Sequence, residues 1–278
     1  MFLKLMYITN RPDVALIAEQ AGVDRIFIDM EYIGKADRQG GMDSVQNHHT
    51  VDDVKAIRSV LTKSDLLVRV NPIHEETADY CSSKDEIDEV IQAGADIVML
   101  PFFKTVEEVQ RFINIVDGRV KTMLLMETPE AADLVDKIIA VPDIDEIHLG
   151  INDMSLGYGK KFMFELLSDG TVEKLCLKFK LAGIPFGFGG IASIGTGQLP
   201  AEAILKEHYR LGSSMVILSR SFCNVNRNMS LDHIREKFSI GVRSMRAFED
   251  EISVHSNYFK RNVNTVAECV HSIVKSIN

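Results

Sequence analysis

Cysteine is scarce and scattered in this 278-residue sequence. The four cysteines lie far apart and form no Cys-x-x-Cys pair: Cys81, Cys176, Cys223 and Cys269. This spacing argues against a structural zinc site, which needs closely paired ligands, and it provides no disulfide framework. We therefore expect the cysteines to be buried or spare thiols.

Long apolar runs are also missing. No stretch of 18 apolar residues occurs, and the start MFLKLMYITN reaches polar residues too soon for a signal peptide. We therefore expect no membrane-spanning segment and a cytoplasmic location. The composition, 46% hydrophobic and 26% charged, is that of an ordinary globular chain that can bury a full core.

Positive charge is in deficit, because 31 Lys and Arg stand against 40 Asp and Glu, for a formal net charge of −9. No basic run with interleaved aromatic residues occurs, so a general affinity for nucleic acid is not expected. Small anionic substrates remain compatible with this composition, since local cations rather than net charge decide their binding.

Several motifs of covalent or dinucleotide chemistry are absent. No Gly-x-Gly-x-x-Gly follows the first apolar segment, no Gly-x-Ser-x-Gly elbow occurs, and no lysine within a predicted strand stands out as a Schiff-base former. These absences favour a metal-dependent mechanism over a covalent one.

Eight short apolar segments of strand length recur along the chain, with amphipathic segments between them. The intervening stretches have helical spacing, and several open on Ser, Thr or Pro and close on Gly. Eight alternations in about 220 residues predict a (β/α)₈ TIM barrel, with a doubly wound open sheet as the alternative. The eight segments begin at Lys4, Arg25, Asp65, Asp96, Lys121, Glu146, Pro185 and Met215.

Two parts of the chain are predicted, a barrel over residues 1–228 and a C-terminal helical segment over residues 229–278. The last helical stretch keeps an apolar stripe on one face. That stripe packs either on its own barrel or on a neighbouring subunit of a homo-oligomer. The residues of the stripe are Val266, Val270, Ile273, Val274 and Ile277.

Two carboxylates, Glu127 and Asp153, come just after the fifth and sixth predicted strands. In a parallel barrel the C-terminal ends of neighbouring strands open onto one mouth, where such enzymes carry their chemistry. Mg²⁺ or Mn²⁺ prefers oxygen ligands, and one or two protein carboxylates suffice to hold it. The pair therefore predicts a metal site, and the alternative is a helix N-cap or surface acid at each place.

Other polar residues are predicted at the same mouth. Arg69 lies in an otherwise apolar strand, where its planar guanidinium suits two-point contact with a substrate carboxylate. The alternative for Arg69 is a salt bridge to Asp29 or Glu31. Gly189 and Gly190 belong to a glycine-rich stretch after the seventh strand, where many barrels bind phosphate or carboxylate through backbone N–H groups. The alternative is a tight turn that lets strand and helix pack closely.

Histidine is the natural base near neutral pH, and His48 and His49 follow the second predicted strand. Both are candidates for acid–base work at the mouth, and a solvent-exposed pair is the alternative. His148 alternates with apolar residues in a strand, so we expect it to be packed and hydrogen-bonded rather than a ligand. Asn152, next to Asp153, is a further candidate for substrate binding.

Five motifs together resemble the HpcH/HpaI aldolase and citrate lyase beta-subunit family, over roughly Lys4 to Cys223. The resemblance implies that Glu127 and Asp153 bind a divalent metal and that Arg69 binds the carboxylate of a 2-oxo acid. It also implies trimers or hexamers with exchanged C-terminal helices. The motifs are FIDMEY (27–32), LVRVNP (67–72), AGADIVMLPF (93–102), LLMETPEA (124–131) and HLGINDMSLGYG (148–159), of which the last two are the most specific.

One departure affects the expected mechanism. Where the aldolases of the family have Asp-x-Glu-His, this chain has Tyr32 in place of the histidine, and Lys35 and Arg38 follow as in the citrate lyase branch. The resemblance implies a metal-dependent aldolase or lyase that cleaves a 2-oxo acid to pyruvate, or a similar enolate, and an aldehyde. The alternatives are a lyase acting on an acyl-CoA thioester, as in citrate or malyl thioester cleavage, and a non-catalytic barrel subunit.

Overall fold

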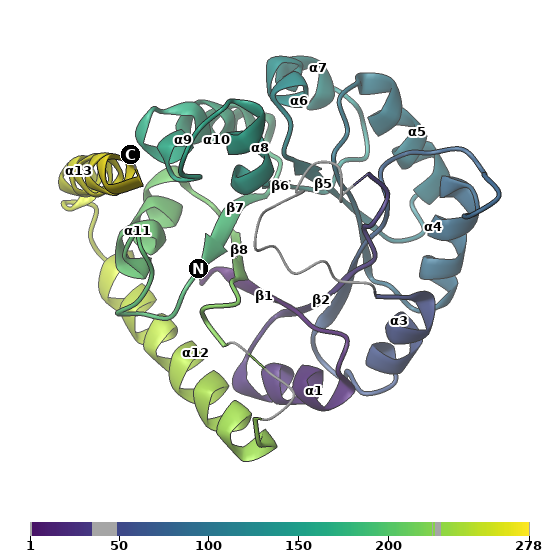
Figure 1. The fold of residues 1–278 in the computed structure, drawn as a ribbon, viewed down its shortest axis with the longest axis horizontal. Coiled ribbons are helices and arrows are strands. Elements are labelled where there is room, and N and C mark those ends of the chain that lie inside the picture. The colour runs from purple at the N-terminus through teal and green to yellow at the C-terminus, as the bar shows by residue number, and fades with distance from the viewer. Residues whose placement is uncertain (1, 35–48, 224, 226–228, 278) are drawn as a thin grey trace.

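The computed structural model describes residues 2–34, 49–223, 225 and 229–277 of the chain. Within these residues, eight parallel strands close into a barrel in chain order and helices surround it (Figure 1). Closure is direct, because β1 and β8 pair in parallel, and this excludes the open sheet. The strands are β1 (Lys4–Ile8), β2 (Arg25–Asp29), β3 (Asp65–Arg69), β4 (Ile97–Leu100), β5 (Lys121–Met126), β6 (Glu146–Leu149), β7 (Phe186–Ile191) and β8 (Met215–Leu218).

The TIM barrel predicted from the sequence is therefore confirmed, and every predicted strand begins within one residue of an observed strand. Several surrounding helices begin at a residue whose hydroxyl accepts a backbone N–H, as Thr50, Ser82 and Thr105 do. The helices are α1 (Pro12–Ala21), α3 (Val51–Arg58), α4 (Ser83–Gln92), α5 (Val106–Val116), α6 (Pro129–Asp133), α7 (Val135–Ile138), α8 (Ile151–Gly157), α9 (Glu165–Ser168), α10 (Thr171–Ala182), α11 (Ala201–Leu211), α12 (Leu231–Ser253) and α13 (Phe259–Ile277).

Aspartates that precede three of the strands lock the strand register. The carboxylates of Asp24, Asp96 and Asp145, which come just before β2, β4 and β6, accept backbone N–H groups from β1, β3 and β5 at 2.7 to 2.8 Å. In each case the donor is the second residue of the strand. A buried N–H that lost this acceptor would be left without a hydrogen bond, so the contact stabilises one register over its neighbours.

The interior of the barrel is a packed core, as is usual for this fold. Its middle is apolar and rich in methionine, while a buried ion pair closes the end where the strands begin. There the Nη1 and Nη2 atoms of Arg25 donate to the carboxylate of Glu146 at 2.5 and 2.7 Å. The predicted site lies at the other end, the mouth. The apolar layer consists of Met6, Phe27, Leu67, Ile97, Met99, Met123, Leu125 and Met215.

The two C-terminal helices pack on the outside of the barrel. Helix α12 lies against α1 and α11, and α13 lies against α9 and α11 (Figure 1). Helix α13 buries Asn262, Val266 and Val270, while Ile277 at its end remains 51% exposed. In the single chain the apolar stripe thus packs mainly on its own barrel, and its contact with a neighbouring subunit stays a prediction.

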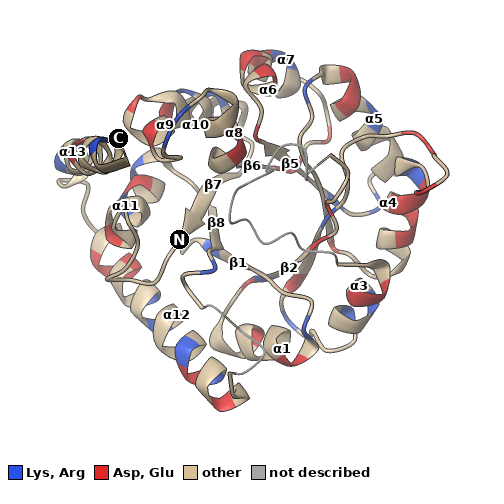
Figure 2. Cartoon of the chain, in the orientation of Figure 1, with Lys and Arg blue, Asp and Glu red and all other residues tan. Residues whose placement is uncertain are grey.

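Charged residues lie mainly on the outer helices, and most residues of the strands are uncharged (Figure 2). In the described part of the chain, no helix combines the length and the apolar character needed to cross a bilayer.

Candidate active site

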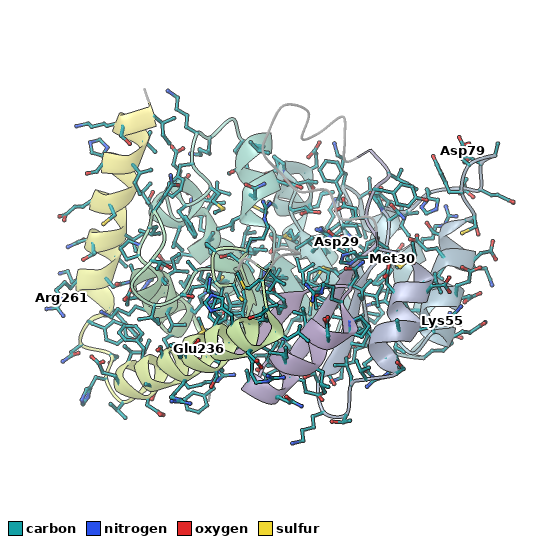
Figure 3. All side chains as sticks on the ribbon, turned by 60° about the horizontal axis from the view of Figure 1, so that its bottom comes forward. Asp29, Met30, Lys55, Asp79, Glu236 and Arg261 are labelled. Carbon is teal, nitrogen blue, oxygen red and sulfur yellow. The ribbon has the colours of Figure 1, made fainter. Side chains whose placement is uncertain are left out.

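Most of the polar residues predicted at the mouth lie at, or just after, the C-terminal ends of the strands. Figure 3 shows Asp29 and Met30 near the middle of the molecule, whereas Lys55 and Asp79 point outwards from the periphery. Asp29 is the last residue of β2 and is 1% exposed. Such burial of a carboxylate is costly unless a charged or hydrogen-bonding partner compensates it.

Arg69, at the end of β3, is that partner. Its Nε and Nη2 atoms each donate to a carboxylate oxygen of Asp29 at 2.8 Å, and its Nη1 atom lies 3.3 Å from Oε2 of Glu31. Asp29 and Arg69 are direct neighbours in the pairing of β2 with β3, which explains the two-point contact. The salt bridge considered as the alternative role of Arg69 is therefore present.

The ion pairs do not use up the hydrogen-bonding capacity of Arg69. The contact with Asp29 takes two of the five N–H groups of a guanidinium. Burial by itself would lower the pKa of Arg69, but the carboxylates of Asp29, Glu31 and Glu127 raise it above its ordinary value. Arg69 is thus a permanent cation with Nη groups able to donate to a second anion, and its contact with a substrate carboxylate stays a prediction.

Glu127 directly follows β5 and is 4% exposed. Its Oε1 atom accepts the backbone N–H of Phe102 at 3.0 Å. A Cβ placed on Gly150 would lie 2.7 Å from Oε2 of Glu127, so only glycine leaves room for this carboxylate. Phe102 has φ 48°, a left-handed conformation that bulky residues rarely adopt, so the N–H that orients Glu127 comes from strained backbone.

The helix-cap alternative does not hold for Glu127, because the hydroxyl of Thr128 caps α6 by accepting the N–H of Ala131.

Asp153 lies in the first turn of α8, where Nδ2 of Asn152 donates to its Oδ1 at 3.1 Å. Met126 pairs with Leu149 at the ends of β5 and β6. The segments that carry the two candidate ligands therefore leave the sheet next to each other.

His49 is brought to the mouth, since its Nδ1 atom accepts the backbone N–H of Asp29 at 3.0 Å. His48, Lys35 and Arg38 lie outside the described residues. His148 is 1% exposed and its Nε2 lies 3.0 Å from the carbonyl oxygen of Gly189. Burial lowers the pKa of His148 to about 4, so it is a neutral, packed histidine, as expected.

The glycine-rich strand β7 has packing reasons for two of its glycines. A Cβ on Gly187 would lie 2.4 Å from the carbonyl oxygen of Met215, and one on Gly189 would lie 2.8 Å from Cδ1 of Ile151. Gly189 also has a φ of 57°, which favours glycine. A Cβ on Gly190 meets only ordinary contacts at 3.6 Å. Substrate binding by Gly189 and Gly190 stays a prediction.

A family model described as HpcH/HpaI aldolase/citrate lyase matches residues 3–184, which include Asp29, Arg69, Glu127 and Asp153. The chain belongs to this family. The match ends just before β7, so the last two strands and helices lie beyond it. No functionally curated protein sequence matches the chain.

Solved structures of the family share the fold. An HpcH/HpaI aldolase/citrate lyase family protein from Burkholderia cenocepacia J2315 is 15% identical, with a TM-score of 0.59, over 78% of this chain and 88% of that one. An HpcH/HpaI aldolase from Desulfitobacterium hafniense DCB-2 is 17% identical, with a TM-score of 0.58, over 78% of this chain and 86% of that one.

The family commonly uses a divalent metal, and the residues at the mouth fit one. Among the described residues, Arg69 pairs with Asp29 and Glu31, and Glu127 and Asp153 add two further carboxylates, whose negative charge a bound cation would offset. The described residues contain no cluster of three or more His, Cys, Asp or Glu side chains suited to a metal. Two carboxylates completed by water or substrate oxygens are the ligand set that Mg²⁺ or Mn²⁺ accepts.

Some residues that shape the site escaped the sequence reasoning. The N–H of Phe102 orients Glu127, and Gly150 leaves room for its carboxylate because it has no Cβ. Neither role has a signature in the sequence. Glu86 of α4 is a third such residue, because it is 5% exposed and bonds to Asn71 behind the mouth. A signal existed for Glu86, since this carboxylate falls on the same helical face as the buried Ile87 and Val90.

Proposed function

We propose that this member of the family is a divalent-metal-dependent carbon–carbon lyase. It would cleave a 2-oxo hydroxy acid to pyruvate, or a similar product, and an aldehyde. The observation that carries the proposal is the buried carboxylate of Glu127, oriented by the N–H of Phe102 and fitted against Gly150. Burying a carboxylate costs free energy, and this one is held at the barrel mouth, where enzymes of this fold carry their chemistry.

The residues around the mouth would have different roles in the reaction. Glu127 and Asp153 would hold the cation, which as a Lewis acid polarises the oxygens of a 2-oxo acid when bound. Arg69 would donate its remaining Nη hydrogens to the substrate carboxylate, while Asp29 and Glu31 keep the guanidinium plane fixed. A substrate fixed in this way meets donors that are already in place, which lowers the activation free energy of the reaction.

The rim of the same mouth carries further candidate contacts. Asn152 is exposed beside Asp153, and Gly189 and Gly190 are half-buried at the end of β7. Backbone and amide donors of this kind would select the part of the substrate that departs as the aldehyde.

We assign to His49 the role of a hydrogen-bond donor to the substrate. Because Nδ1 of His49 accepts the N–H of Asp29, the neutral ring carries its hydrogen on Nε2. In this tautomer His49 can donate a hydrogen bond from Nε2 but cannot take up a proton there. The base that removes the hydroxyl proton of the departing aldehyde is then a different group, and His48 remains the candidate from the sequence.

The proposal is tested by the exchange of pyruvate methyl protons with D₂O, followed by NMR in the presence of Mg²⁺ or Mn²⁺. We expect exchange that a chelator abolishes and that Glu127→Ala abolishes as well. Glu130→Ala is the matched control, because Glu130 is an exposed carboxylate three residues further on that pairs with Lys104. It should leave the exchange unchanged.

The other outcomes point to the two alternatives. A protein that binds the metal and does not exchange pyruvate protons would favour an acyl-CoA thioester as substrate. A protein that binds no divalent metal would favour a non-catalytic barrel subunit. A cytoplasmic location and assembly into trimers or hexamers stay predictions, and light scattering of the purified protein tests the second of them.

A further inference from the structure

A carboxylate of the outer helix layer reaches the residues behind the mouth. Glu86 lies on the barrel-facing side of α4 and is 5% exposed. Its Oε1 atom accepts a hydrogen bond from Nδ2 of Asn71 at 2.7 Å, and both its oxygens lie within 3.2 to 3.3 Å of the backbone N of Asn71. Burial raises the pKa of Glu86, and the bonds from Asn71 oppose that rise.

Asn71 also binds the segment that follows β2. Its Oδ1 atom accepts the backbone N–H groups of Tyr32 at 2.9 Å and of Ile33 at 3.0 Å. Because Nδ2 is directed to Glu86, the amide group has only one orientation in which all these bonds form. Asn71 is 2% exposed, so water does not compete for its side chain.

The segment held in this way carries Glu31 and directly follows Asp29, and these are the two carboxylates that bind Arg69. The regular pairing of β2 with β3 ends at Asp29, and the N–H of Met30 still reaches the carbonyl oxygen of Arg69 at 2.9 Å. Glu31 follows with 0% exposure and lies 3.3 Å from Arg69, directly before the two amides that Asn71 accepts. The position of Glu31 therefore depends on bonds on both of its sides.

We propose that Glu86 and Asn71 act as a latch that fixes the segment after β2 and thereby holds Asp29 and Glu31 in the position that orients Arg69. Glu86 is then a positioning residue of the active site although it lies on an outer helix. The structural part of this inference is independent of the reaction, and its catalytic consequence rests on the proposed function.

The structural part is tested by hydrogen exchange of the full-length protein, measured by NMR. In Glu86→Ala we expect the amides of Tyr32 and Ile33 to exchange about tenfold faster or more, because the group that orients Asn71 is lost. Glu86→Gln should restore slow exchange, since its amide oxygen can accept the same bonds. Glu89→Ala removes an exposed carboxylate from the same helix and should change nothing. Unchanged exchange of both amides in a folded Glu86→Ala protein would overturn the latch.

A second variant keeps the test decisive if Glu86→Ala does not fold. Asn71→Ala removes the acceptor itself, so it should accelerate exchange at Tyr32 and Ile33 while the core strand amides of Val68 and Val98 keep their protection. Wild-type exchange at Tyr32 and Ile33 in this variant would equally overturn the proposal.

The catalytic consequence has its own readout. In Glu86→Ala we expect the rate of pyruvate proton exchange at saturating pyruvate to fall by about tenfold or more, because a small misplacement of Arg69 weakens substrate orientation. The affinity for Mn²⁺ should change by less than about twofold, because Glu127 follows β5 and Asp153 lies in α8, outside the segment that the latch fixes. Equal loss of Mn²⁺ affinity would overturn the action through Arg69. If the wild-type protein exchanges no pyruvate protons, the proposed function fails and the amide exchange still decides the latch.

Discussion

Replacing Gly150 by alanine perturbs Glu127 without touching its chemistry. The backbone of Gly150, at φ −81° and ψ 76°, lies outside the left-handed region, so alanine brings no strain of that kind. The new Cβ would lie 2.6 Å from Cβ and 2.7 Å from Oε2 of Glu127, where ordinary contact begins at 3.4 Å. The carboxylate must therefore retreat by about 0.7 Å, which exceeds the tolerance of about 0.2 Å for a metal–ligand distance.

We expect Gly150→Ala to weaken Mn²⁺ binding by about tenfold or more and to lower the free energy of unfolding by about 1–3 kcal/mol, as overpacking does. Titration followed by electron paramagnetic resonance measures the affinity, and urea unfolding measures the stability. Gly157→Ala is the control, because its Cβ would lie 2.6 Å from Cδ of Pro129 rather than against the carboxylate. It should lose stability and keep its Mn²⁺ affinity. Unchanged Mn²⁺ affinity in folded Gly150→Ala would refute the role of Glu127.

Three further predictions concern the rest of the barrel. Glu146→Ala removes the carboxylate that is hydrogen-bonded to the fully buried Arg25 and leaves it with Asp65 at 3.6 Å, so urea unfolding should show a loss near the lower end of about 3–5 kcal/mol. Burial lowers the pKa of His148 to about 4 and of His208 to about 3. On acidification the unfolded chain takes up protons at these histidines first, near pH 6.5. The free energy of unfolding therefore falls below about pH 6.5, by at most about 1.4 kcal/mol per pH unit for each histidine. A free energy of unfolding that stays constant down to pH 5 would be inconsistent with both lowered pKa values. Phe102→Gly keeps the N–H to Glu127 and removes the cost of the left-handed conformation, about 1 kcal/mol, so Mn²⁺ affinity should stay within about twofold; a large loss would mean that the ring, not the N–H, orients Glu127.

Much of the fold could be predicted because the alternation of strands and helices is regular. Each apolar segment is bounded by turn residues, and parallel strands in a closed barrel bring their C-terminal ends to one mouth. That rule alone placed Arg69, Glu127 and Asp153 at the same end of the molecule, and it placed Asp29 and Glu31 beside Arg69.

The finer geometry of the site could not be predicted, because it depends on contacts between segments far apart in the sequence. Whether Arg69 pairs with Asp29, with Glu31 or with both is decided by the register of β2 and β3. The left-handed backbone of Phe102 is a cost that only the surrounding structure can sustain, and no local pattern announces it. Glu86 acts through Asn71, so its role follows from a chain of hydrogen bonds rather than from a motif.

The claim that Glu127 and Asp153 hold a divalent cation is tested most directly by anomalous diffraction from crystals grown with Mn²⁺. The account predicts one strong peak at the mouth, at an ordinary metal–oxygen distance of about 2.1 Å from a carboxylate oxygen of each residue. Glu127→Gln crystals grown in the same way should lose or weaken that peak. A Mn²⁺ peak elsewhere, or none at saturating Mn²⁺ with both carboxylates ordered, would contradict the account.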